Sequence, residues 1–145
     1  MANIKRLEAL ADMIASLNDF WNPESESYQL RNPGMCRAHS FKQLNSVDEQ
    51  GRRIFTSLIG GYRFLIQDLT WKCEGTTRAK GEHGRLKPTS SLVDLLKAFK
   101  LNSLDKQMQA VAFLNMALKT LDTTEEITSE TELKFFLEGD TDGRS

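Results

Sequence analysis

The N-terminal segment carries the clearest helical pattern in the chain. Over residues 3–19 the apolar side chains recur at steps of three and four, which places them on one face of a helix. These residues are Ile4, Leu7, Leu10, Ala11, Ile14 and Leu17. Asn22 and Pro23 end the pattern, because proline lacks a backbone donor and disfavours helix in the residue before it. We therefore expect an amphipathic helix over residues 3–19.

Residues 22–53 are polar and irregular, with a tight turn at Pro33-Gly34. A second helix is predicted from Ser46 or Val47 to Lys72, either continuous or broken near Gly51. Its apolar stripe consists of Ile54, Phe55, Leu58, Ile59, Tyr62, Leu65, Ile66 and Leu69. Gly60-Gly61 in its middle costs about 1 kcal/mol of helix stability per glycine. Such a pair indicates that another backbone or a ligand approaches closely.

Three further helices are predicted after a basic loop at residues 73–88. Thr89, Ser90 or Ser91 can cap the first of them, and Ser103 the second. The helix after Ser103 is apolar on several sides near residues 111–118, so we expect it to be the most buried. Ser129 and Glu132 fit a capping box for a last short helix. Residues 140–145 are predicted to be a flexible tail, which leaves residues 1–139 as a single all-α domain.

Composition and length fit one globular domain without a membrane span. The chain has 145 residues, 39% of them hydrophobic, and no apolar run approaches the roughly 20 residues that cross a bilayer. Glu8 and Asp12 interrupt the apolar part of the first segment, which is typical of a helix and not of a secretion signal. We therefore expect no membrane partner and a cytoplasmic protein as synthesised, with association with a virion as a further option.

Cysteine and histidine are too sparse for a metal centre. Cys36 and Cys73 are the only cysteines, and His39 and His83 the only histidines. None of them forms a CxxC or HExxH pattern, so we predict neither a metal nor a cofactor. Reduced thiols are favoured over a disulfide in a chain without a secretion signal.

A net charge of −1 hides a strong segregation of charge. Residues 31–100 hold 13 Lys and Arg against 6 acids, a net charge of +7, whereas the two ends together carry −8. The segregation indicates either a patch for an anionic partner or two solvated faces that attract each other. The candidate patch consists of Arg52, Arg53, Arg63, Lys72, Arg78, Lys80, Arg85 and Lys87.

An ordered series of short motifs resembles a known family. The turn reads RNPGMCR, and a phenylalanine, a serine two residues later, a Gly-Tyr pair and an Asp-Leu pair follow it. In this chain they are Phe55, Ser57, Gly61, Tyr62, Asp68 and Leu69. Over roughly residues 10–100 the sequence is similar to the lysozyme-like muramidases and lytic transglycosylases of phages and bacteria. The resemblance implies a lysozyme-like helical fold and peptidoglycan as the ligand.

The chain departs from this family where the chemistry would lie. The family has a glutamate at the end of the first helix, whereas this chain has Asn18-Asp19. Cleavage of a glycosidic bond needs a protonated carboxylic acid, and an amide cannot replace it. Asn18 therefore predicts lost or weakened cleavage. The alternative acids are Asp19, Glu24 and Glu26.

Three functions remain open from the sequence. The first is an active muramidase or transglycosylase that uses one of the alternative acids. The second is a lysozyme-like domain without cleavage, which binds a glycan or a protein as an inhibitor or a virion-associated component. The third is a nucleic-acid-binding helical domain that uses the basic patch. The candidate ligand-binding residues of a cleft are Tyr28, Arg31, Asn32 and Tyr62. The rings of Trp21, Tyr28 and Tyr62 either stack on sugars or pack in the core or at the rim. Asn32 either bonds an N-acetyl group or, as we favour, its own turn backbone.

Overall fold

The computed structural model describes residues 3–37, 47–76, 86–119 and 126–139. Helices follow one another in this part of the chain, and the only strand-like pairings in it are isolated bridges such as Arg37 with Arg52 and Val47 with Arg53. The elements are α1 (Ile4–Leu17), α2 (Glu26–Gln29), α3 (Leu58–Glu74), α4 (Leu92–Ala98), α5 (Leu104–Lys119) and the 3-10 helix η2 (Leu133–Phe136). The predicted all-α class is confirmed. No helix in the described ranges is both long and apolar enough to cross a membrane.

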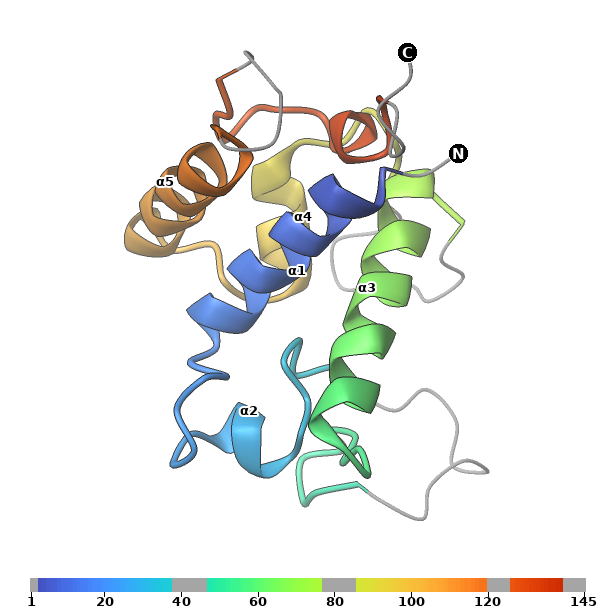
Figure 1. The fold of residues 1–145 in the computed structure, drawn as a ribbon, viewed down its shortest axis with the longest axis vertical. Coiled ribbons are helices and arrows are strands. Elements are labelled where there is room, and N and C mark those ends of the chain that lie inside the picture. Colours follow the sequence, from blue (N-terminus) through green and yellow to red (C-terminus); the bar gives the residue numbers. More distant parts are fainter. Residues whose placement is uncertain (1–2, 38–46, 77–85, 120–125, 140–145) are drawn as a thin grey trace.

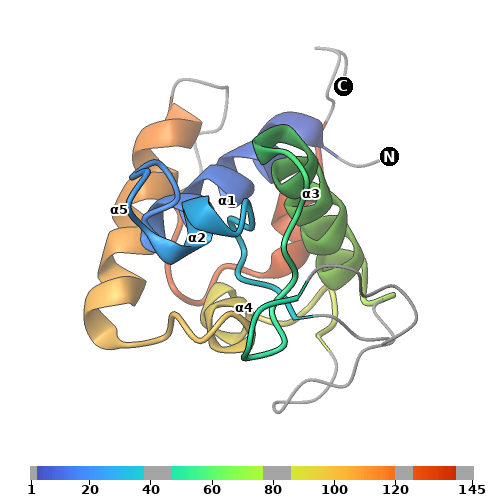
Figure 2. The ribbon, with the colours of Figure 1, turned by 90° about the horizontal axis from the view of Figure 1, so that it is seen from below.

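Helix α1 lies at the centre of the fold, between α3 and α5 (Figures 1 and 2). Eight of its residues are buried: Leu7, Ala9, Leu10, Ala11, Met13, Ile14, Ala15 and Leu17. The predicted helix is confirmed, but it ends at Leu17, two residues early. Asp19 turns the chain with a left-handed backbone, φ 58°, so the helical path cannot continue to it.

The predicted start of the second helix at Ser46 or Val47 is wrong. Helix α3 begins at Leu58, where Ser57 has an extended backbone and its hydroxyl accepts a hydrogen bond from the Gly60 N–H at 3.0 Å. Before it, the carboxylate of Asp48 accepts hydrogen bonds from the backbone N–H groups of Gln50 and Arg52. This turn uses donors that a helix would need, so residues 47–57 stay irregular.

The N-terminus of α4 is a capping box. The hydroxyl of Ser91 accepts a hydrogen bond from the Asp94 N–H, and the Asp94 carboxylate accepts one from the Ser91 N–H at 3.0 Å. The second capping box, predicted from Ser129 and Glu132, is wrong. Glu132 precedes η2 and makes no side-chain cap bond, while the Ser129 carbonyl accepts a hydrogen bond from the Val93 N–H. The C-terminal segment is thus held by the start of α4.

Helix α5 is not the most buried helix, contrary to the prediction. Its core side is narrow, with Ala110, Leu114 and Leu118 buried. On its outer side Leu104 is 73% exposed, Met108 64% and Met116 77%. Periodicity correctly indicates an apolar helix, but α1 has neighbours on several sides whereas α5 lies at the edge of the fold.

The two ends of the described chain are fastened to each other. The side-chain amide of Asn3 donates a hydrogen bond to the Glu138 carbonyl oxygen at 2.7 Å. The guanidinium of Arg6 donates one to the Phe135 carbonyl at 2.8 Å and lies 4.0 Å from the centre of the Phe135 ring. Both ends therefore lie on one edge (Figure 1). The predicted tail at 140–145 lies outside the described residues.

Candidate functional site

The Asn32-Pro33-Gly34 turn is a rigid element anchored by the Asn32 side chain. Asn32 is 1% exposed. Its amide donates hydrogen bonds to the carbonyls of Cys36 at 3.0 Å and Arg53 at 2.9 Å, and its oxygen accepts one from the Cys36 N–H at 3.0 Å. Three contacts to backbone explain why a buried asparagine is stable here. The Asn32 side chain therefore organises the loop.

This turn packs directly on α3 at the predicted glycine pair. A Cβ atom on Gly61 would lie 1.8 Å from the Arg31 carbonyl oxygen, a distance that no side chain tolerates. Gly61 therefore allows the turn backbone to touch the helix, as the close-approach interpretation of Gly60-Gly61 predicted. Gly34 faces Leu65 of the same helix, where a Cβ would come within 2.8 Å of the Leu65 Cδ1 atom.

Asn18, the last residue before the chain reverses after α1, is bonded to the same turn. Its side-chain amide donates a hydrogen bond to the Pro33 carbonyl oxygen at 2.9 Å. Its backbone carbonyl accepts one from the Ser27 hydroxyl at 2.7 Å. The side chain of Asn18 therefore holds the chain reversal after α1 against the turn, and its backbone carbonyl holds it against α2. Asn18 connects three segments of the fold.

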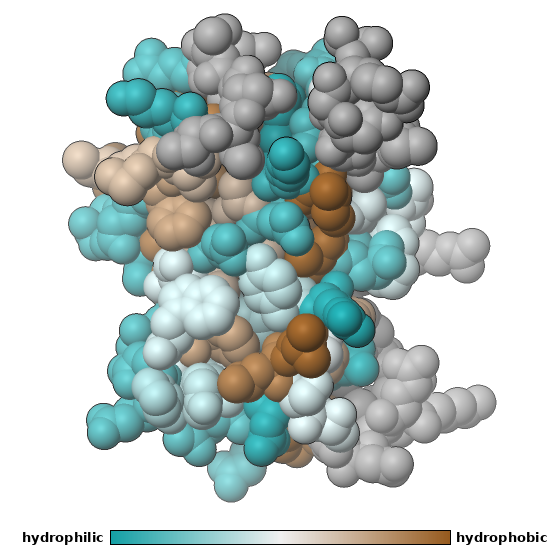
Figure 3. All heavy atoms as spheres, viewed as in Figure 1, coloured by the Kyte–Doolittle hydropathy of each residue, from teal (hydrophilic) through white to brown (hydrophobic). Residues whose placement is uncertain are grey.

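Beside this junction lies an aromatic groove of about 340 Å³. We define it by its lining residues, which are Asp12, Phe20, Trp21, Tyr28, Leu58, Ile59 and Tyr62. They come from α1, the loop after it, α2 and the first turns of α3. The rings of Trp21 and Tyr62 lie 6.5 Å apart at 46°, and Trp21 is 58% exposed. Near the middle of the face shown in Figure 3, brown hydrophobic side chains adjoin paler ones.

Asp12 is the only carboxylate among the described residues that line the aromatic groove. The phenol of Tyr62 donates a hydrogen bond to Asp12 Oδ1 at 2.5 Å. Burial raises the pKa of Tyr62, and the hydrogen bond to Asp12 and the negative charge of that carboxylate raise it further. The phenol thus remains a donor well above neutral pH. The Tyr62–Asp12 pair supplies the polar groups of an otherwise apolar groove.

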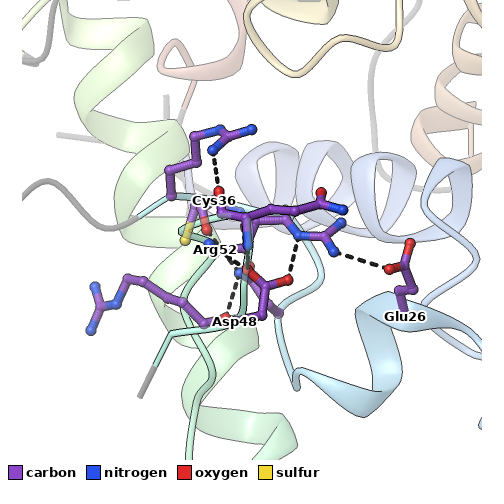
Figure 4. Close-up of polar contacts among 8 residues, drawn as sticks. Glu26, Cys36, Asp48 and Arg52 are labelled. Carbon is purple, nitrogen blue, oxygen red and sulfur yellow. Dashed lines mark hydrogen bonds and ion pairs between the residues drawn. The ribbon is translucent and has the colours of Figure 1, made fainter. Parts of the chain in front are cut away.

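A second depression, which we call the acidic depression, lies on the other side of α2. It measures about 500 Å³, and its charged lining consists of Glu24, Glu26, Asp48, Glu49 and Arg52. Arg52 lies between two of these carboxylates, 3.0 Å from Glu26 and 2.7 Å from Asp48 (Figure 4). Glu26 is 72% exposed at its side chain. Leu30 and Val47 also line this depression, but the Glu26 carboxylate is paired with Arg52, and such an ion pair favours the charged carboxylate over the protonated acid that glycoside cleavage needs.

The predicted cleft residues are therefore divided between two places. Tyr28 and Tyr62 line the aromatic groove, whereas Glu24 and Glu26 line the acidic depression. Asp19 is exposed and lines neither, and its carboxylate accepts a hydrogen bond from Asn22 at 2.9 Å. The exposed Arg31 also lines neither.

Several cations of the predicted basic patch interact with other side chains of the protein. Lys72 contacts both carboxylate oxygens of Asp68, at 2.6 and 2.7 Å, and Arg52 is paired as described above. The guanidinium of Arg53 lies 4.6 Å from the centre of the Phe55 ring and 4.7 Å from that of Phe64. Arg63 and Lys87 are exposed. Arg78, Lys80 and Arg85 lie outside the described residues.

Four groove residues, Asp12, Phe20, Leu58 and Ile59, do not stand out in the sequence as site residues. Asp12 interrupts the apolar pattern of α1, which by itself indicates only a solvated helix face. By their spacing, Leu58 and Ile59 fit the core stripe of a longer helix, but they are 36% and 60% exposed at the start of α3. Large apolar side chains beside an N-cap serine are the signal that could have identified them.

Cys36 and Cys73 are not linked by a disulfide. In the described part of the chain, no group of three or more His, Cys, Asp or Glu residues is arranged to hold a metal ion. No protein-family model matches the chain, and no curated protein sequence or solved structure shows significant similarity to it. The fold and the groove therefore define an all-α protein with an aromatic surface site, and the muramidase resemblance remains a sequence-based prediction.

Proposed function

We propose that this protein is a lysozyme-like domain that binds a peptidoglycan glycan strand in the aromatic groove and does not cleave it by the family's acid mechanism. The observation that carries the proposal is the position of Trp21, Tyr28 and Tyr62 around one depression of about 340 Å³. This volume lies within the range of roughly 300–1,000 Å³ typical of small-ligand sites.

The chemistry of the groove fits a sugar ring. A hexose has C–H groups on its faces and hydroxyls at its edge, so it packs on flat aromatic side chains that carry a polar tip. Trp21 and Tyr62 supply such rings, with their centres 6.5 Å apart. The Asp12 carboxylate, whose Oδ1 accepts the Tyr62 hydrogen bond, can accept further hydrogen bonds from sugar hydroxyls at Oδ2.

The arrangement of carboxylates favours binding over cleavage. Glu24 and Glu26 lie in the acidic depression and not beside the aromatic rings. The amide of Asn18 is occupied by the Pro33 carbonyl. Most glycosidases act with two carboxyl groups across the scissile bond, whereas the described lining of the groove contains Asp12 alone.

Tryptophan fluorescence gives a direct test. The chain has two tryptophans, so a Trp71→Phe variant leaves Trp21 as the only indole. Titration with soluble peptidoglycan fragments or N-acetylglucosamine oligomers should shift the Trp21 emission and saturate. Tyr28→Ala and Tyr62→Phe should each weaken binding, and Trp21→Ala, followed by calorimetric titration because it removes the fluorophore, should abolish it. Glu24→Gln is the matched control because it changes the other depression. Saturable binding that is unaffected by these groove variants would contradict the site.

The same fragments test for cleavage. The proposal expects no new reducing ends and no anhydro ends by mass spectrometry after incubation with purified peptidoglycan. Cleavage that is lost in Asp12→Asn would identify Asp12 as an acid and overturn the non-cleaving function. Loss in Asp19→Asn, Glu24→Gln or Glu26→Gln would instead support one of the sequence-based alternatives.

The apolar rim of the groove supports a second candidate, a protein partner. Ile59 is 60% exposed and Leu58 36%, beside the half-exposed Trp21. Exposed apolar residues that adjoin one another mark protein contacts more often than isolated ones do. In this case Ile59→Glu would abolish capture of the partner, whereas the fluorescence titration with sugars would show no saturation.

A further inference from the structure

The outer face of α5 is an apolar stripe with a symmetric arrangement. Leu104, Met108, Ala112 and Met116 follow one another at four-residue steps, and all four are exposed. Met108, Ala112 and Met116 point away from the buried side of the helix, where Ala110, Leu114 and Leu118 face the core, and Leu104 lies at the flank. Figure 3 shows hydrophobic side chains gathered over α5 at the upper left. Figure 2 places this helix at the edge of the molecule.

The stripe is centred on its smallest residue. Met108 precedes Ala112 by four residues and Met116 follows it by four, so each lies about 40° to one side and about 6 Å along the axis. A small residue between two long ones lets a second helix approach closely. In an antiparallel pair centred on Ala112, Met108 of one copy would meet Met116 of the other.

The charges at the two ends of this face have the same symmetry. Asp105 precedes Ala112 by seven residues and Lys119 follows it by seven. Seven residues are close to two full turns, so both lie within about 20° of the Ala112 direction. In an antiparallel pair, Asp105 of each copy would lie beside Lys119 of the other, which gives two ion pairs. A parallel copy would bring like charges together.

We propose that α5 is a homodimer interface in which two copies pack antiparallel about a twofold axis at Ala112. A shallow crossing of about 20° keeps residues seven positions from the centre within reach of the other helix. The same patch then serves both copies, as a twofold interface requires. The aromatic groove lies on other elements, so the interface leaves it open.

Light scattering and sedimentation equilibrium over a concentration series test the proposal. The expected mass rises from the monomer's 16.5 kDa toward twice that value. Ala112→Lys places two like charges on the axis and should keep the protein monomeric. Circular dichroism checks that this variant is folded, which is expected because position 112 is exposed.

Charge exchange tests the orientation of the two helices. Asp105→Lys and Lys119→Asp should each weaken association by about fivefold, since two symmetric surface ion pairs are lost. The double variant should restore association. If the helices were parallel, or if α5 bound a different protein, the double variant would not restore the association that the single variants weaken.

Cross-linking tests the axis itself. Ala112→Cys should form an intermolecular disulfide on mild oxidation, because the two positions meet at the centre. Ala98→Cys, at an exposed position of α4, is the matched control and should not. A monomer at every concentration, with equally slow cross-linking in both variants, would overturn the proposal and leave the stripe to a different protein.

Discussion

The side-chain amide of Asn18 donates a hydrogen bond to the carbonyl oxygen of Pro33, 2.9 Å away. This bond joins the end of α1 to the turn that packs on α3. Asn18 therefore has a structural role: it fixes the chain reversal after α1 against the turn.

Asn18→Asp should destabilise the protein by about 1–3 kcal/mol at pH 7, because a carboxylate oxygen would face the Pro33 carbonyl and no donor would remain. The defect should shrink below about pH 4, where the protonated carboxyl can donate. Urea denaturation at both pH values measures this. Asn102→Asp, at an exposed position before α5, is the control and should change stability by less than about 0.5 kcal/mol. Equal stability of the two variants would refute the role of Asn18.

Gly61→Ala should lower the free energy of unfolding by about 3 kcal/mol or more, because the new Cβ would lie 1.8 Å from the Arg31 carbonyl oxygen. Gly60→Ala meets only the Ser57 hydroxyl, at 2.9 Å, so its loss of about 1 kcal/mol at the helix cap should be offset by a gain of about 1 kcal/mol in helix propensity, leaving stability nearly unchanged. Thermal and chemical denaturation compare the two. If alanine at position 61 proves as mild as at position 60, the turn does not pack on α3 as described.

Tyr62 should ionise above the ordinary tyrosine pKa of about 10. The chain has two tyrosines, so a Tyr28→Phe variant isolates the Tyr62 phenolate in an ultraviolet absorbance titration. Adding Asp12→Asn should lower the midpoint, since it removes the negative charge that opposes ionisation. A midpoint near 10 with Asp12 intact would show that the pair does not form.

Tyr62 also gives stability a pH dependence. Its pKa is raised in the folded state, so its contribution is fully present below about pH 10 and is lost as the pH rises further. Tyr62→Phe should therefore flatten the decline of the unfolding free energy above that pH. An unchanged decline would assign the alkaline loss to other groups.

Both thiols should react slowly in the folded protein. Burial raises the pKa of Cys36 to about 11, assisted by the charge of Asp68, and burial together with Glu74 raises that of Cys73 to about 12. With a pKa of about 11 in place of the ordinary value near 9, Cys36 holds about a hundredfold less thiolate at pH 8. Alkylation followed by mass spectrometry should therefore be at least that much faster in urea. Fast labelling of Cys36 in the native state would contradict its described environment.

The elements that could be predicted from the sequence are those whose causes are local. The apolar spacing of α1 and the serine before α4 act within a few residues, so both could be read from the chain. The start of α3 could not, because Asp48 forms its turn while Arg52 reaches across to Glu26 on another segment. Burial of α5 was overestimated for a similar reason, since apolar character does not say how many neighbours a helix has.

The candidate site was predictable in part. Tyr28 and Tyr62, candidate ligand-binding residues in the sequence, do line one groove. Asp12 could not be recognised because its role depends on the chain reversal at Asp19. There the Phe20 N–H bonds back to Ala15 and the Trp21 indole to Ser16, which brings both rings beside α1. The spacing of apolar residues does not predict which residues come together across a chain reversal.

The fastening of Asn3 to Glu138 determines how the domain would respond to mechanical tension. A force applied between these two residues first acts on the hydrogen bond from the Asn3 side chain to Glu138 and on the contact of Arg6 with Phe135. The core between α1 and α3 is loaded only afterwards. Since the two contacts lie at the point where the force enters, they would open one after the other and not together. The domain would therefore yield from its edge inward, releasing η2 while the aromatic groove, built on other elements, keeps its shape.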